Sequence, residues 1–282
     1  MRKRISFISV LTMFLAIGFV IIFSRPVKAA ANGVILKANR TYAAYDVTGD
    51  GMKDKIRIRA ANQTDDEAYA SLTVSVNGKT ACRLKNTRFY NVIANIYTLK
   101  NGQPFLYLYA PADNGDGPVC ALLKYTNGKF RKILDFTEIM AGYGNHRIGE
   151  VTNLNGNKIV ITESIVSYSL GINAINFTYK YVNGKFVPTS RYGSYKEIYS
   201  TDGSSRYFTV NSDLPAYARP GATAVNTTLK AGSLTKIIKC ALISGKMYIQ
   251  LECDGEIYWI KALENPPIAD NERQFMEVRY AG

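Results

Sequence analysis

Short alternations of apolar and polar residues recur along the chain and predict β-strands. Three of them start about 50 residues apart, each soon after a glycine-bearing turn, and they are Ile56–Arg59, Leu106–Tyr109 and Ile159–Thr162. Because successive side chains of a strand point to opposite faces, this alternation is typical of a strand with one buried face. Further β-prone runs fill the gaps, and they are Ser71–Val76, Val119–Tyr125 and Ala174–Tyr181.

An Asn-Gly dipeptide recurs between these predicted strands. The segment Lys124–Phe130 is repeated almost unchanged as Lys180–Phe186, and Val76–Lys79 is a shorter copy. Both central residues of a type I′ turn need a positive φ, so Asn-Gly between β-forming residues is the strongest short signal for a hairpin. The sequence therefore repeats one unit of strands and hairpins.

These units predict an all-β fold with three β-sheet repeats over residues 30–195. Between residues 31 and 200, no run of ten or more residues has a helical period. A closed propeller has about four to eight blades. Three repeats are too few for closure, so they are expected to form a propeller-like open stack or a sandwich.

The first thirty residues have the organisation of an export signal. Three cations, Arg2, Lys3 and Arg4, precede 19 residues without a charge, Ile5–Phe23, and Val27-Lys28-Ala29 is a small-x-small cleavage site. This order predicts a secretory signal peptide over residues 1–29. The uncharged run is also long enough to span a bilayer, so an N-terminal anchor is the alternative, and the only membrane contact we expect. In both cases the remaining chain is expected outside the cytoplasm, secreted or at the cell surface.

The chain is strongly basic, with a formal net charge of +13. Removing residues 1–30 removes five cations and no acid, which leaves +8 on the rest. In an exported protein this excess favours anionic partners such as wall polymers or lipid headgroups, and we expect no nucleic-acid partner. The alternative is a solvated basic surface that only confers solubility. No dense run of Lys and Arg marks a patch.

Residues 46–54 place oxygen ligands at the spacing of a calcium loop. Positions one, three, five, seven (through its carbonyl) and nine are Asp46, Thr48, Asp50, Met52 and Asp54, with Gly51 at the sharp turn. Oxygen ligands at this spacing suit Ca²⁺. The loop resembles those of FG-GAP and VCBS-type β-propeller repeats, and the resemblance implies a structural calcium ion in the first repeat. The alternative is an exposed turn without an ion.

A second part of the chain begins after a break in the repeat. Residues 196–205 are predicted to be a linker, and residues 206–282 a small barrel with a C-terminal tail, because short strands there alternate with Gly- and Pro-rich turns. Three segments, Leu214–Gly221, Thr228–Ser233 and Gly245–Ile260, resemble in order and spacing the bacterial SH3-like (SH3b) domains.

This resemblance implies a groove lined by aromatic side chains that binds peptidoglycan or a peptide. The candidate ligand-binding residues are Tyr207, Tyr217, Tyr248 and Tyr258, and the alternative is that they simply cover the barrel. Trp259 is expected in the core, because a lone Trp in an alternating strand usually packs inward.

Four cysteines and one histidine limit the chemistry. Two disulfides, Cys82–Cys120 and Cys240–Cys253, suit an exported chain, and free buried thiols are the equal alternative. His146 lies in a Gly-rich segment and is expected on a surface loop. A Cys–His mechanism would need His146 beside Cys82 or Cys120, and neither cysteine lies in a recognisable nucleophile motif. We therefore expect no catalytic residue.

Together these features predict an exported, non-enzymatic cell-envelope protein that binds or scaffolds. Binding to the wall or to peptides would use the C-terminal barrel, and calcium would stabilise the first repeat. The alternatives are a secreted cell-wall hydrolase and a glycan-binding adhesin.

Overall fold

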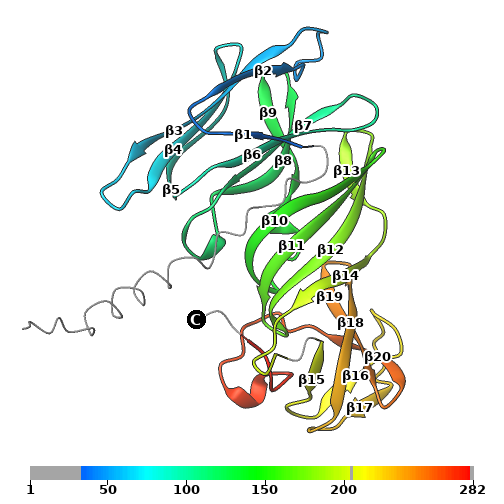
Figure 1. The fold of residues 1–282 in the computed structure, drawn as a ribbon. Helices are drawn as coiled ribbons and strands as arrows, with labels where there is room; N and C mark the ends of the chain where they lie inside the picture. The colour runs from blue at the N-terminus through cyan, green and yellow to red at the C-terminus, as the bar shows by residue number, and fades with distance from the viewer. Residues whose placement is uncertain (1–32, 204–205, 280–282) are drawn as a thin grey trace, which may run out of the picture.

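The computed structural model describes residues 33–203 and 206–279, and this part of the chain is almost entirely β-structure (Figure 1). The all-β prediction is confirmed. Helical structure in the described ranges is limited to three 3₁₀ turns, η1 (Asp113–Gly115), η2 (Phe136–Glu138) and η3 (Asp270–Glu272). Within these ranges, none is long and apolar enough to cross a bilayer. The predicted signal peptide or anchor lies outside the described residues.

The first repeat is a four-stranded antiparallel sheet, called the first sheet below. Its strands, in spatial order, are β2 (Thr41–Tyr45), β3 (Asp54–Gln63), β4 (Tyr69–Val76) and β5 (Lys79–Phe89). On β3 the apolar side chains of Ile56 and Ile58 are buried, whereas Arg57 and Arg59 are exposed. The alternation in the sequence thus sets which face of the sheet is buried.

The predicted Asn-Gly hairpins are confirmed. Asn77 and Gly78, which join β4 to β5, have φ angles of 49° and 81°, as a type I′ turn requires. Positive φ angles recur at Asn127–Gly128 and at Asn183–Gly184. The three equivalent turns confirm that the sequence repeat is a structural repeat.

The second repeat forms the second sheet. Its strands, in spatial order, are β1 (Val34–Leu36), β6 (Ile93–Thr98), β7 (Pro104–Ala110), β8 (Val119–Thr126) and β9 (Lys129–Asp135). Strand β1 precedes the first sheet in the sequence but pairs with β6 of the second. The first two repeats are therefore joined by the chain at two places.

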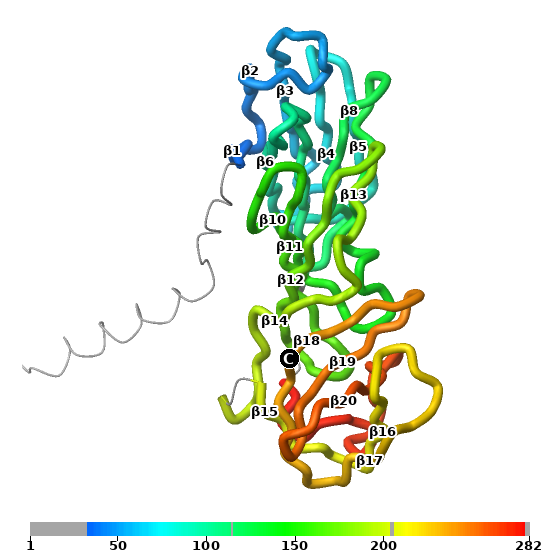
Figure 2. Tube along the Cα trace, turned by 90° about the vertical axis from the view of Figure 1, so that its right-hand side faces the viewer, coloured from blue at the N-terminus to red at the C-terminus, as the bar shows by residue number. Residues whose placement is uncertain are grey.

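The second sheet lies between the other two, and its inner strands β6–β8 are largely buried on both faces. On β7, Leu106 and Leu108 pack in the core shared with the first sheet, whereas Tyr107 and Tyr109 pack in the core shared with the third. Figures 1 and 2 show the sheets following one another along an elongated molecule. The repeats thus form the open stack rather than a single sandwich.

The third repeat and the C-terminal segment form one nine-stranded sheet, the third sheet. Its main path is β10 (Gly144–Asn155), β11 (Lys158–Ser167), β12 (Gly171–Val182), β14 (Tyr192–Ile198), β18 (Leu234–Ile243), β19 (Lys246–Cys253) and β20 (Glu256–Lys261). Two further strands pair beside this path, β13 (Lys185–Pro188) with β12 and β15 (Tyr207–Thr209) with β18. A separate two-stranded sheet contains β16 (Leu214–Ala216) and β17 (Thr227–Leu229).

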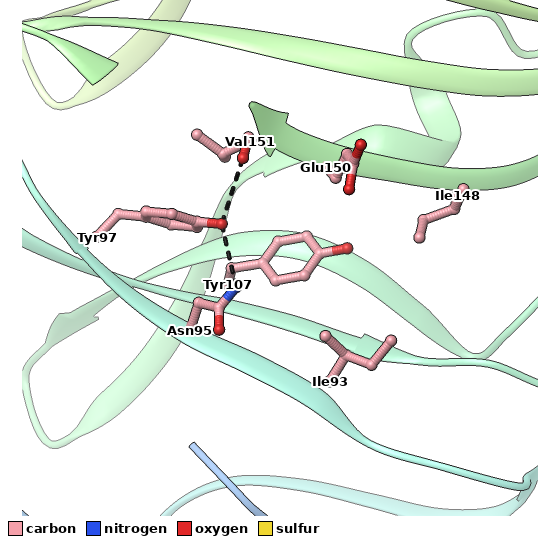
Figure 3. Close-up of a pocket in the computed structure, with 7 residues that line it drawn as sticks. All are labelled: Ile93, Asn95, Tyr97, Tyr107, Ile148, Glu150 and Val151. Atoms are coloured by element: carbon pink, nitrogen blue, oxygen red, sulfur yellow. Dashed lines mark hydrogen bonds between the residues drawn. The ribbon is translucent and has the colours of Figure 1, made fainter. Parts of the chain in front are cut away.

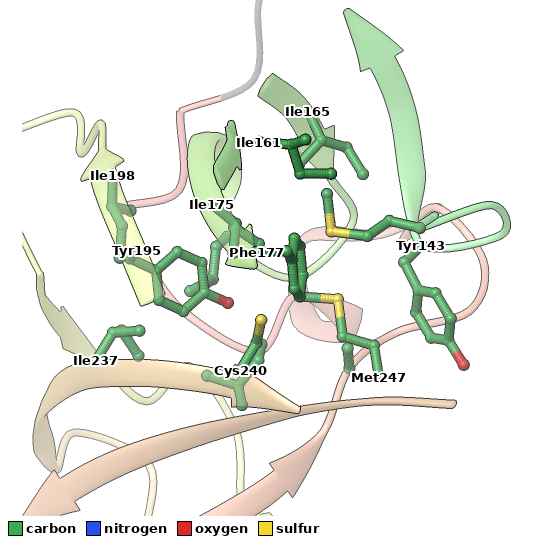
Figure 4. Packing of buried hydrophobic residues seen from close by; sticks show 14 of the residues in the cluster. Tyr143, Ile161, Ile165, Ile175, Phe177, Tyr195, Ile198, Ile237, Cys240 and Met247 are labelled. Carbon is green, nitrogen blue, oxygen red and sulfur yellow. The ribbon is translucent and has the colours of Figure 1, made fainter. Parts of the chain in front are cut away.

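In the described residues no sheet is closed into a barrel, so the C-terminal strands form an open arrangement and an SH3-like barrel stays a prediction. Strands β18–β20 continue the third sheet, because β14 pairs with β18 through Gly193 and Cys240, and β16 meets β20 through a single bridge between Tyr217 and Trp259. Figure 4 shows that Cys240 and Met247 pack against Phe177 of β12 in one core. The expected linker at 196–205 begins inside β14. The division of the chain into two domains at this linker stays a prediction.

Tyrosines of the second sheet hydrogen-bond to the edge of the third. Strand β10 is an edge strand, and the hydroxyls of Tyr109, Tyr107 and Tyr97 donate to its carbonyls at residues 147, 149 and 151 over 3.0, 2.7 and 3.4 Å. Figure 3 shows the Tyr97 contact. Unpaired edge carbonyls invite pairing with other chains. The tyrosines therefore both fix the spacing of two sheets and cover an edge.

The junction at Gly193 gives a stability prediction. A Cβ atom at this position would lie 2.5 Å from Phe177 Cε1 and 2.7 Å from Ile175 Cγ2. We expect Gly193→Ala to lower the free energy of unfolding by about 1–3 kcal/mol through overpacking. The exposed neighbour Ser194 provides the control, and Ser194→Ala should change the free energy of unfolding by less than about 0.5 kcal/mol. Denaturant unfolding should show one transition that shifts as a whole. Two transitions, of which only one shifts, would contradict the continuity of the third sheet.

Candidate functional site

The outward face of the first sheet collects cations from two strands. Lys55, Arg57 and Arg59 alternate along β3 with buried residues, and Arg83 and Lys85 lie on β5. All five side chains are exposed. These five residues are called the basic face below. Strand β4 separates the two rows.

The strand register places small hydroxyl side chains between the two rows of cations. Thr73 of β4 pairs with Arg59 on one side and Arg83 on the other. Ser71 pairs in the same way with Ala61 and Lys85. Because short side chains lie between long ones, the face is hollowed, and a depression of about 410 Å³ is lined by Arg59, Thr73, Arg83 and Lys85 among others.

The cations of the basic face are not neutralised by the protein. Within residues 33–203 and 206–279, none of the five pairs with a carboxylate at 4.0 Å or less. The acids near the first sheet lie at its ends, and Asp66 pairs there with Arg88. The like charges of the two rows repel one another across β4, so an anion on this face would relieve an existing repulsion.

Sequence reasoning missed this face. No dense run of cations marks it in the sequence, because β3 and β5 contribute from positions 24 or more residues apart. The alternation of Lys and Arg with Ile in Lys55–Arg59 was the available signal. This pattern indicated that one face of β3 is charged. It did not indicate that β5 would lie two strands away from β3 in the sheet.

The acidic loop is held by its own hydrogen bonds. The Asp46 carboxylate accepts from the backbone N–H groups of Gly49 at 2.6 Å and Gly51 at 2.7 Å. Slight desolvation raises the pKa of Asp46, but these hydrogen bonds outweigh it and hold the pKa below the usual value. Asp54 is buried and accepts from Val47 N at 2.7 Å and Thr48 N at 2.9 Å.

Oxygen atoms of the predicted calcium ligands are engaged in hydrogen bonds within the protein. Asp50 Oδ1 accepts from Met52 N within its own turn, and Asp54 Oδ1 accepts from Asn77 Nδ2. In the described ranges no three His, Cys, Asp or Glu side chains are placed to hold a metal ion. The loop geometry is therefore explained without an ion, and calcium stays a prediction.

A substitution at Asp54 distinguishes hydrogen bonding within the loop from the predicted calcium binding. We expect Asp54→Ala to lower the free energy of unfolding by about 1–3 kcal/mol even in a chelator, since buried N–H donors lose their acceptor. Asp50→Ala, at an exposed position, is the control and should have a much smaller effect. If Asp54→Ala changed the melting temperature only when calcium was present, the hydrogen-bond explanation would fail.

The four candidate tyrosines do not form one groove. Tyr217 and Tyr248 are buried together with Trp259 in a small cluster, which confirms the core position expected for Trp259. Tyr258 packs against the main core on the opposite face of the third sheet. Only Tyr207 is exposed, at 45 %, beside Lys236. Lys261 covers the Tyr217 ring at 5.1 Å, so the protein's own cation occupies that aromatic surface.

The four cysteines are free thiols in the structure. Cys240 pairs in the sheet with Ile249, and Cys253 pairs with Thr235, so these two cysteines are not opposite each other. The Cys120 sulfur interacts with the backbone of Gly149, accepting from its N at 3.4 Å and donating to its O at 3.3 Å. Burial raises the pKa of Cys120 to about 12, which keeps the thiol protonated. This is the opposite of an activated nucleophile.

His146 lies on β10 rather than on a surface loop, and its expected exposure was wrong. The edge strand turns the imidazole inward, leaving its side chain 17 % exposed, with Nε2 3.0 Å from Oε2 of the fully buried Glu163. In the described part of the chain, neither atom has a hydrogen bond of good geometry. Burial, reinforced by the charge of Asp135, raises the pKa of Glu163 well above its usual value. Burial lowers the pKa of His146 against opposing effects of Asp116 and Asp135.

Two other hollows are less suited to a ligand. The cavity beside Tyr97 and Glu150 has a volume of about 10 Å³, room for one water molecule (Figure 3). A depression of about 250 Å³ lies where Pro266 and Pro267 of the C-terminal tail meet Val166 and Tyr168. The basic face is larger and more strongly charged than either.

Comparisons with known proteins add no assignment. The chain matches no family model, no curated protein and no solved structure. The resemblances to FG-GAP or VCBS-type repeats and to SH3b domains therefore stay predictions.

The Glu163 site gives a pH prediction. Burial raises the pKa of Glu163 in the folded protein, whereas in the unfolded chain this carboxyl titrates in the ordinary range, so Glu163 lowers stability increasingly as the pH rises above that range. We expect Glu163→Gln to make the decline of the unfolding free energy between about pH 5 and pH 8 shallower. Glu138→Gln, at an exposed carboxyl, should leave the slope unchanged. An unchanged slope in Glu163→Gln would show that the buried carboxyl is already ionised.

Proposed function

We propose that this chain is an exported, non-enzymatic cell-envelope protein that attaches to an anionic polymer through its basic face. The observation that carries the proposal is the pair of cation rows on β3 and β5, which no described carboxylate neutralises. The two rows lie on either side of the short side chains of β4. The predicted export signal supports a partner in the envelope. The net charge of +8 predicted for the exported part supports an anionic one.

Binding at this face needs no conformational change. Its cations lie on two strands, β3 and β5, which both pair with β4 and whose other face is packed in a core, so their backbone positions are fixed before a ligand arrives. Preorganisation of this kind reduces the entropy lost on binding. Contacts between exposed charges are individually weak and screened by salt, so affinity would come from several of them acting on one polymer.

The placement of the titratable core groups supports binding over catalysis. Glu163 and Cys120 are inaccessible, and burial pushes both toward their neutral forms. Neither lines the hollow of the basic face. The accessible groups of that face are cations and hydroxyls, which suit recognition of an anion.

The test measures binding of two labelled anionic polymers, a poly(glycerol phosphate) and a polyglutamate, to the chain lacking residues 1–30. We expect binding that the double variant Arg59→Ala/Arg83→Ala weakens roughly thirtyfold, because each cation beside an anionic polymer contributes on the order of 1 kcal/mol. The dependence of log Kd on log salt should also become shallower by about two. Fluorescence anisotropy at several salt concentrations measures both quantities.

The matched control is Lys129→Ala/Arg131→Ala, which removes two exposed cations from β9 of the second sheet. It has the same net charge as the test variant and should bind nearly as the parent does. Equal losses in the two variants would show that only total charge matters. Absence of binding to both polymers at low salt would overturn the proposed function.

A further inference from the structure

A row of hydroxyl side chains runs along β4, between the two rows of cations of the basic face. Ser71, Thr73 and Ser75 occupy every second position of the strand and lie on its outward side. Alternate residues of a strand are about 6.6–6.8 Å apart. The row is therefore a straight line of neutral donors with a fixed repeat.

Each step of this row has at least one cation beside it. Thr73 lies between Arg59 and Arg83, Ser75 lies beside Arg57, and Ser71 lies beside Lys85. Neighbouring strands are about 4.8 Å apart, so β3 and β5 are separated by roughly 10 Å. Two arginine side chains can reach one group above Thr73 from that separation. The strongest position is thus in the middle of the row.

The Thr73 hydroxyl is available to a ligand. Ser71 Oγ donates to Ala61 O at 3.3 Å, and Ser75 Oγ donates to Arg57 O at 3.5 Å. In the described ranges, Thr73 Oγ1 takes part in no such bond to the protein. One free donor therefore lies between two guanidinium groups that are not paired with any described carboxylate.

We propose that the polymer bound here is a phosphodiester-linked polyol chain that runs along β4, with one phosphate above Thr73. This inference rests on the proposed function and adds the chemistry and direction of the ligand. In such a chain, the two bridging oxygens of each phosphate lie along the polymer, and the two charged oxygens point to its sides. One charged oxygen therefore faces Arg59 and the other faces Arg83.

The charge of a phosphodiester chain is in its backbone, which suits a narrow hollow. Successive phosphates can follow β4, with cations on both sides at Thr73 and on one side at Ser71 and at Ser75. Guanidinium groups bind phosphate oxygens through paired donors. A polycarboxylate carries its charges on branches, with both oxygens of each group on the same side of the chain. It cannot present one oxygen to each row in the same way.

A single-stranded nucleic acid has the same phosphodiester chemistry but suits this face less well. Proteins that bind single strands stack the bases on aromatic side chains. The described residues that line the hollow include no aromatic side chain. The polyol phosphate is therefore the partner that the face favours.

The experiment compares three labelled polymers of matched charge number, poly(glycerol phosphate), polyglutamate and single-stranded DNA, on the same chain lacking residues 1–30. We expect the polyol phosphate to bind most tightly. Arg59→Lys/Arg83→Lys keeps the charge but removes the paired donors, and it should weaken binding of the polyol phosphate about tenfold. Binding of polyglutamate should weaken less, because each of its carboxylates can face only one of the two arginines. Thr73→Val should weaken binding of the polyol phosphate about fivefold.

The control for Thr73→Val is Thr228→Val, at an exposed position on β17, which should leave all three affinities unchanged. Circular dichroism and melting temperature check that each variant is folded. If polyglutamate bound as tightly as the polyol phosphate and both responded to Arg59→Ala/Arg83→Ala, the proposed function would stand and this inference would be overturned. Tighter binding of the DNA would overturn the choice of a polyol phosphate. If no polymer bound, the proposed function itself would fail.

Discussion

The second sheet has no face in water along its inner strands, since the odd-numbered side chains of β7 pack toward the third sheet and the even-numbered ones toward the first. Its residues must therefore be apolar on both faces, and the polar atoms that enter must find partners. The hydroxyls of Tyr97, Tyr107 and Tyr109 find them at the carbonyls of β10. Because each tyrosine buries a ring and ends in a donor, one residue type both fills the space between sheets and satisfies the edge strand.

Local signals in the sequence predicted the repeat well. Alternation identified β3, and the Asn-Gly turns identified the hairpins, because both are properties of neighbouring residues. The continuation of the third sheet into the C-terminal strands could not be predicted in the same way. The pairing of Gly193 with Cys240 joins residues 47 positions apart, and it depends on Gly193 having no side chain where Phe177 packs. No local pattern describes such a contact.

The candidate site was predicted less well than the fold, for a related reason. The tyrosines near the C-terminus were chosen by residue type, but type does not say which face of a strand points inward once that strand joins a larger sheet. Tyr248 and Tyr258 are on adjacent strands yet lie on opposite faces. His146 was assigned to a loop because glycines surround it, whereas Gly144 and Gly149 fit the close packing of β10 against its neighbours. Those two glycines are required by close packing of the strand and do not mark a flexible loop.

The position of the basic face follows from the stack itself. A cation placed on the inner strands β6–β8 of the second sheet would be buried in a core, at a high desolvation cost. The first sheet ends the stack and packs on one side only, so its outer face can hold several like charges in water. The buried Glu163 illustrates the opposite case, since its carboxyl stays protonated where water is excluded. The same layering that pushes a core carboxyl toward neutrality therefore leaves the charged residues of β3 and β5 exposed together.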